Sequence, residues 1–211
     1  MRRVTLQRDR AFWTIAMQVA IVNLFLGGFG PGQSLLRSQQ HTSLTIASLH
    51  GTAIGVANIL AGFAGPHLVH KFGRATTSWL GLALFTVGVL MFVLSPPIQL
   101  TLFATLIAAL GVSIVINSMV TQLSHHYSQD PTRAVSQASG IASGGYVLGT
   151  LTVGTIAGTS FNWRLGLLIT IPLSVVLYLV ARTSIESEQI PDKQGPQKGT
   201  INPQSCYPRF R

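Results

Sequence analysis

The sequence predicts an all-α membrane protein with six transmembrane helices. Charged residues make up only 9% of the chain and hydrophobic residues 47%, whereas soluble globular proteins carry roughly 25% charged residues. The charges are also unevenly spaced. A bilayer-spanning helix needs about 20 mostly apolar residues, and the charge-free runs together provide the length for six spans. The runs that contain no Asp, Glu, Lys or Arg are 11–36, 38–70, 75–129, 134–163 and 165–181.

Turn-forming residues and polar segments set the ends of the first three helices. Gly30 and Pro31 can end a helix, so the first helix is predicted over 11–30, after a basic N-terminus of residues 1–10. The second helix follows a polar segment and ends before Lys71, over 43–69. Pro96 and Pro97 divide the longest run, because two adjacent prolines remove backbone hydrogen bonds from a helix.

The same signals define the remaining helices. A polar connector over 125–133 contains His125 and His126, which are expected to be solvated, and a short turn over 159–162 precedes the last helix. The tail over 183–211 mixes charge with proline and is predicted to be disordered. The six predicted helices span 11–30, 43–69, 77–94, 98–123, 134–158 and 163–182.

The distribution of basic residues predicts the orientation. Six spans place both termini on one side, and basic loops stay in the cytoplasm. The side of the membrane opposite the termini holds only Arg37 and Arg164. Both termini and the loops after the second and fourth helices are therefore predicted to be cytoplasmic, in the cell (inner) membrane. The basic residues on this cytoplasmic side are Arg2, Arg3, Arg8, Arg10, Lys71, Arg74, Arg133, Arg182, Lys193, Lys198, Arg209 and Arg211.

Several function classes are excluded by this pattern. The net charge of +9 comes from residues between and beside the apolar runs, where they orient helices, so no nucleic-acid partner is expected. The single cysteine, Cys206, rules out an internal disulfide and a Cys-based metal cluster. No nucleophile elbow, phosphate loop or metal-ligand spacing is visible. The chain is therefore not expected to be an enzyme or to bind a metal or cofactor.

Small residues mark the expected helix contacts, because helices in lipid associate by close backbone approach. The fifth and second predicted helices are densest in them. These stripes fit either a tight static bundle or an interface that slides during a transport cycle. The glycines concerned are Gly51, Gly55, Gly140, Gly144, Gly145, Gly149, Gly154 and Gly158.

Polar side chains inside the spans are candidates for a solute path. Gln18, Asn23, Asn58 and Asn117 lie within predicted helices, although an amide in a membrane helix more often makes a helix-to-helix hydrogen bond. No carboxylate lies within the spans. Coupling to an ion gradient would then have to use His50, backbone carbonyls or another polypeptide.

The segment from Gly65 to Arg74 resembles the signature loop of the major facilitator superfamily, between its second and third helices. Lys71, Gly73 and Arg74 match fixed positions of that signature, and His70 stands at its aspartate. Further similarity lies in Arg133 to Gly140 and in Asn162 to Gly166, and the resemblance covers roughly 12–182.

The resemblance implies a secondary active transporter of a small solute that works by alternating access. It implies that His70, Lys71, Gly73 and Arg74 form a cytoplasmic latch loop. Such transporters contain two six-helix halves, and this chain supplies one, with its second and fifth helices at the junction. The chain is then part of a split or truncated transporter, or a homodimer. The alternative is a non-transporting six-helix membrane interaction protein or an inactive fragment.

Overall fold

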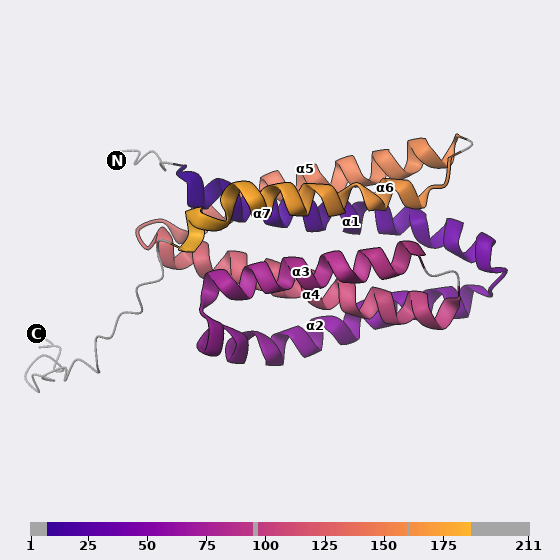
Figure 1. Cartoon of the computed structure of the whole chain (residues 1–211), viewed down its shortest axis with the longest axis horizontal. Coiled ribbons are helices and arrows are strands. Elements are labelled where there is room, and N and C mark those ends of the chain that lie inside the picture. Colours follow the sequence, from indigo (N-terminus) through magenta and orange to yellow (C-terminus); the bar gives the residue numbers. More distant parts are fainter. Residues whose placement is uncertain (1–7, 95–96, 160, 187–211) are drawn as a thin grey trace, which may run out of the picture.

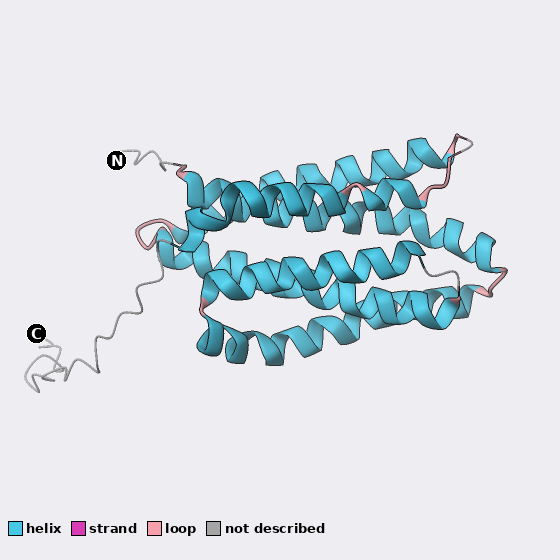
Figure 2. Ribbon diagram, viewed as in Figure 1, coloured by secondary structure: helices cyan, strands magenta, loops and turns pink. Residues whose placement is uncertain are grey.

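The computed structural model describes residues 8–94, 97–159 and 161–186, and in this part of the chain every regular element is a helix (Figures 1 and 2). Six candidate spans are long and apolar enough to cross a membrane, the last of them divided into α6 and α7. The predicted all-α membrane fold is confirmed. Most of the predicted tail, 187–211, lies outside the described residues, as does 1–7. The helices are α1 (Arg10–Gln40), α2 (Leu44–Phe72), α3 (Arg74–Leu94), α4 (Ile98–His126), α5 (Pro131–Ala157), α6 (Arg164–Leu168) and α7 (Thr170–Glu186).

Two helices differ from the prediction at prolines. α1 does not end at Gly30 and continues through Pro31 to Gln40. Pro31 has no N–H for the carbonyl of Gly27, and the hydroxyl of Thr150 on α5 donates to that oxygen instead, at 2.9 Å. The last span is interrupted at Ile169, three residues before Pro172, and Pro172 has no N–H to donate to the carbonyl of Leu168.

Most helix ends lie within three residues of the predicted positions, and side chains explain the starts. Asp9 caps α1 by accepting from the backbone N–H of Phe12 at 2.9 Å. Ser43 and Asp130 cap α2 and α5 in the same way. α4 continues to His126 and α5 begins at Pro131, so the predicted polar connector over 125–133 is shorter than expected.

The helices pack as two groups of three spans (Figure 1). α1 lies against α5 and against α7, while α4 lies against α2 and against α3. The contacts follow a repeat of three spans, in which α1, α2 and α3 correspond to α4, α5 and α7. The contacts of α1 with α5 and α7 are then equivalent to the contacts of α4 with α2 and α3. This is the arrangement of a three-helix repeat within one six-helix half.

Aromatic side chains and close backbone approaches fill the centre. Phe25 of α1 packs edge-on against Phe85 and Phe92 of α3, with ring centroids 5.5 and 6.4 Å apart. α3 and α4 approach closely at glycines, because a Cβ on Gly88 or Gly111 would overlap backbone atoms of the other helix.

The buried residues are unevenly shared among the spans. In the most apolar stretch of each helix, 67% of residues are buried in α1 and 56% in α4, but only 17% in α2 and 22% in α5. α2 and α5 therefore have wide exposed faces that the other described helices do not cover.

Candidate functional site

The polar candidates of the spans fall at separate places. Gln18 of α1 is fully buried and accepts a hydrogen bond from the hydroxyl of Ser78 of α3 at 2.5 Å. Its Nε2 has no partner among the described residues. Gln18 therefore joins two helices inside the bundle, which is the commoner role of a membrane amide.

Asn58 and Asn117 lie nearer to the surface. Asn58 of α2 is exposed, and its Oδ1 accepts from the hydroxyl of Ser113 of α4 in a short hydrogen bond. Asn117 is exposed one turn further along α4 than Ser113, and residues four apart share a helix face. Asn58, Ser113 and Asn117 therefore form one polar strip, called here the α2–α4 strip.

Asn23 of α1 is half-buried, and its side chain makes no hydrogen bond to any residue that the structure describes. No hydrogen bond joins any two of Gln18, Asn23, Asn58 and Asn117 in the described part of the chain. The four predicted cavity residues are thus distributed over α1, α2 and α4 and do not form one cluster.

The glycine stripes divide into two classes. Gly145 and Gly149 are buried against α1, and a Cβ on either would overlap the carbonyl oxygens of Ala20 and Leu24, respectively. These two glycines bring α5 onto α1 inside the bundle, so they are not available to a second half. A Cβ on any of five others would meet nothing within 4 Å, namely Gly51, Gly55, Gly140, Gly144 and Gly154. The eighth, Gly158, is exposed at the end of α5.

The predicted latch loop is a single-residue connection between α2 and α3. Gly73 has φ 81° and ψ 164°, a backbone conformation that is essentially restricted to glycine. His70, Lys71 and Arg74 are exposed around it. The carbonyl of Arg74 accepts from Nε2 of Gln122 on α4 at 3.2 Å, which fixes the start of α3.

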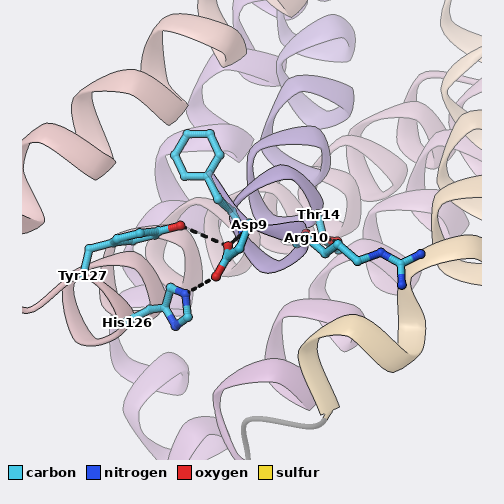
Figure 3. Close-up of polar contacts among 6 residues, drawn as sticks. Asp9, Arg10, Thr14, His126 and Tyr127 are labelled. Carbon is cyan, nitrogen blue, oxygen red and sulfur yellow. Dashed lines mark hydrogen bonds and ion pairs between the residues drawn. The ribbon is translucent and has the colours of Figure 1, made fainter. Parts of the chain in front are cut away.

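The end of the bundle that carries Arg8, Arg10, Lys71, Arg74, Arg133 and Arg182 is called here the basic end. A cluster that sequence analysis missed lies there (Figure 3). Nε2 of His126 on α4 lies 2.5 Å from Oδ2 of Asp9, and the hydroxyl of Tyr127 donates to Oδ1 of Asp9 at 3.0 Å. His126, which was expected to be solvated, is therefore paired with a carboxylate.

Asp9 is stabilised in its charged form. Burial acts to raise the pKa of Asp9, but the hydrogen bonds from the Phe12 backbone, His126 and Tyr127, together with the charge of His126, outweigh burial and lower the pKa below its usual value. Next to this cluster, Nε of Arg8 donates to Gln137 of α5 at 3.0 Å. These contacts tie the start of α1 to α4 and α5.

The opposite end of the bundle has two buried polar contacts. His50 of α2 is 1% exposed, and its Nε2 lies 3.2 Å from the hydroxyl oxygen of Thr101 on α4, which also accepts from Gln40 of α1. Arg164, at the start of the last predicted helix, is buried and donates to the carbonyl of Val93 at the end of α3 at 3.0 Å. Both contacts join helices.

The described residues hold no group of three or more His, Cys, Asp or Glu side chains that could bind a metal ion. The site therefore consists of the α2–α4 strip and the exposed faces of α2 and α5, with polar contacts closing both ends of the bundle.

Comparison with known proteins gives the family. The model of the Major Facilitator Superfamily matches residues 13–208, and no curated protein matches the chain. The matched region overlaps all six spans, which are arranged as in one six-helix half of such a transporter. The chain belongs to the major facilitator superfamily.

Proposed function

We propose that this chain is one half of a secondary active transporter, which moves a small solute by alternating access against a second six-helix half. The observation that carries this proposal is the exposure of α2 and α5, the two spans with the smallest buried shares. The second half is either a second copy of this chain or a separate six-helix polypeptide.

The open faces support a partner that shares the bilayer. α2 exposes Ile59 at 62% and Phe63 at 75%, and α5 exposes Val147 at 55% and Leu151 at 57%. Lipid can cover such apolar faces, but the exposed amide of Asn58 and the open glycines on the same helices are better suited to a protein surface. Gly51, Gly55, Gly144 and Gly154 allow another helix to approach closely.

The solute is proposed to pass along the α2–α4 strip, with Asn23 of α1 as a further contact. Asn117 offers both a donor and an acceptor to a polar or amphipathic solute. Because no Asp or Glu lies in a described span, recognition would depend on hydrogen bonds and shape. His50 is the candidate for ion coupling within α2. No cofactor is part of this proposal.

The exposed basic residues support a location in the cell (inner) membrane with both termini in the cytoplasm. In this orientation His70, Lys71, Gly73 and Arg74 form the cytoplasmic latch. The Asp9–His126–Tyr127 cluster closes the same end of the bundle.

Cross-linking tests the second half. In a Cys206→Ser background, Ile59→Cys on α2 and Gly144→Cys on α5 lie equally far along their helices from the basic end. Each is expected to cross-link in native membranes, either to the other position in a second copy or to a separate polypeptide. Val176→Cys on α7, which is 57% exposed, is the matched control and is expected to remain unlinked. A chain that stays unlinked at both test positions would contradict the two-half assembly.

A growth screen tests transport and separates this proposal from a non-transporting interaction protein. A strain lacking the gene is compared with the complemented strain over a broad panel of compounds. We expect the wild-type chain to restore a compound-specific phenotype and Asn117→Leu to fail at equal membrane abundance. Thr152→Val, on α5 and outside the strip, is the control. Restoration of the phenotype by Asn117→Leu would contradict the role of the strip, and the absence of any phenotype would favour the interaction protein.

A further inference from the structure

A groove of about 530 Å³ lies between α3 and α7, which run side by side (Figure 1). The close glycine contacts of α3 are made with α4 on its other side, at Gly81 and Gly88. Toward α7, Trp79 packs edge-on against Tyr178 with centroids 5.3 Å apart. Beyond this pair the small side chain of Ala83 leaves the space that forms the groove.

Polar groups of Trp79, Thr86 and Ser174, which line the groove, are buried or bonded within their own helices. Nε1 of Trp79 is buried and has no partner among the described residues. The hydroxyls of Thr86 and Ser174, which also line the groove, donate to carbonyls of their own helices. Because these hydroxyls are satisfied within their own helices, the groove offers a mainly apolar surface to an occupant.

The length and depth of the groove match one leaflet. Its lining on α3 extends from Thr76 to Val87, about 16 Å at 1.5 Å per residue, and half of the hydrocarbon core is about 15 Å thick. Trp79 lies near the start of α3, at the level where tryptophan side chains meet the membrane interface. An acyl chain with its ester group near Trp79 fits this geometry.

The charge at the mouth of the groove is positive. Arg182 is exposed one turn beyond Tyr178 on the same face of α7, and Arg74 begins α3 at the same end. Basic side chains at a membrane surface attract anionic head groups.

We propose that this groove is a binding site for an anionic glycerophospholipid of the leaflet at the basic end. One acyl chain lies in the groove with its ester group at the level of Trp79, and the phosphate pairs with Arg182. This site does not depend on transport or on a second half, because α3 and α7 are not the open helices assigned to that junction.

Fluorescence quenching tests the site in vesicles of phosphatidylcholine that contain a minor fraction of phosphatidylglycerol, with bromine on the chains of one lipid at a time. The chain with Trp13→Phe and Trp163→Phe reports on Trp79 alone. We expect brominated phosphatidylglycerol to be enriched about five-fold around Trp79 over its mole fraction. The matched control keeps Trp13, which is exposed at the same end, and is expected to follow the mole fraction.

Two substitutions connect the enrichment to the proposed contacts. Arg182→Gln and Ala83→Leu should each return the quenching of Trp79 to the mole-fraction value, whereas Arg133→Gln on α5 should leave the enrichment unchanged. Trp163 is buried, so Trp163→Phe can disturb the packing. Native mass spectrometry of the unsubstituted chain is therefore the second measurement. We expect the chain to retain one phosphatidylglycerol molecule and the Arg182→Gln variant to lose it. Quenching of Trp79 at the mole-fraction value, or enrichment that persists in both groove variants, would overturn the proposal.

Discussion

Gly149 shows how a single residue fixes the distance between two helices. The sequence places it in a small-residue stripe, and the structure uses it where α5 meets the backbone of α1 at Leu24. Gly149→Ala should therefore push the helices apart and destabilise the bundle by about 1–3 kcal/mol. The measurement is the thermal unfolding midpoint in detergent.

Gly144 is the control for this prediction, since it lies on the same helix and a Cβ there meets nothing within 4 Å. Gly144→Ala removes only glycine's low helix propensity, so stability should be unchanged or rise by up to about 1 kcal/mol. Equal losses in both variants would mean that backbone contact at Gly149 does not limit the packing.

Asp9 has two roles that can be separated by substitution and by pH. Asp9→Asn keeps a good helix cap but removes the charge beside His126, whereas Asp9→Ala removes both. Loss of the cap should cost about 1 kcal/mol. The ion pair is partly solvated, with the side chains of His126 and Asp9 22% and 44% exposed, and should contribute at most about 1 kcal/mol.

The pH dependence of this contribution follows from the lowered pKa of Asp9. A carboxyl group with a depressed folded-state pKa stabilises the fold above its unfolded value, about 3.8, and loses this contribution as the pH falls through the folded value. The difference in unfolding midpoint between wild type and Asp9→Asn should thus be present at pH 6, begin to shrink near pH 3.8 and vanish once the pH has fallen through the lower folded-state pKa. A difference that grows on acidification would contradict the assignment.

Sequence alone predicts residue types better than residue partners. Gln18 and Asn58 were identified as intramembrane amides, and both make contacts between helices. The pairing of Asp9 with His126 could not be predicted, because the two residues are 117 positions apart and only the packing of α1 beside α4 brings them together. Tyr127 likewise carries no local signal that it would bind Asp9.

At the scale of elements, two prolines with the same local chemistry have opposite outcomes. Pro172 coincides with an interruption between α6 and α7, whereas α1 continues through Pro31. One difference between them is in α5, where Thr150 donates to the carbonyl that Pro31 leaves free. The sequence therefore predicts six spans from their apolar length, but the end of α1 depends on a residue more than a hundred positions away.

This explanation predicts the effect of Thr150→Val. The substitution keeps the shape of the side chain but leaves the carbonyl of Gly27 without its donor, which should cost about 0.6–2 kcal/mol in a membrane protein. Amide hydrogen exchange should also speed up on both sides of Pro31. Thr150→Ser should restore the protection.

Thr152→Val provides the matched control, because the hydroxyl of Thr152 donates to Leu148 of its own helix at 2.7 Å. We expect its effect on stability to be small. If Thr150→Val leaves both the unfolding midpoint and exchange in α1 at wild-type levels, the continuity of α1 must have another cause.

At the scale of the whole molecule, the two ends of the bundle differ sharply in exposed charge. The start of α1 and the end of α7 lie at the same end (Figure 1), together with the basic connection between α2 and α3. At the opposite end, Arg164 is buried and bonded to α3. Among the described residues, Arg37 is therefore the only exposed Lys or Arg at that end.

This asymmetry makes a prediction about membrane orientation, because exposed basic residues near span ends keep a loop in the cytoplasm. Green fluorescent protein fused after α7 should fluoresce, and alkaline phosphatase should be active when inserted between α1 and α2 at His41 but inactive between α4 and α5 at Ser128. Arg37→Gln should leave this pattern unchanged, since it removes the one exposed charge that opposes it. Active phosphatase at Ser128 would show that the chain has the opposite orientation, with the latch loop and the Asp9 cluster outside the cytoplasm. The described six-helix packing would remain, but the proposed location of the basic end in the cytoplasm would be wrong.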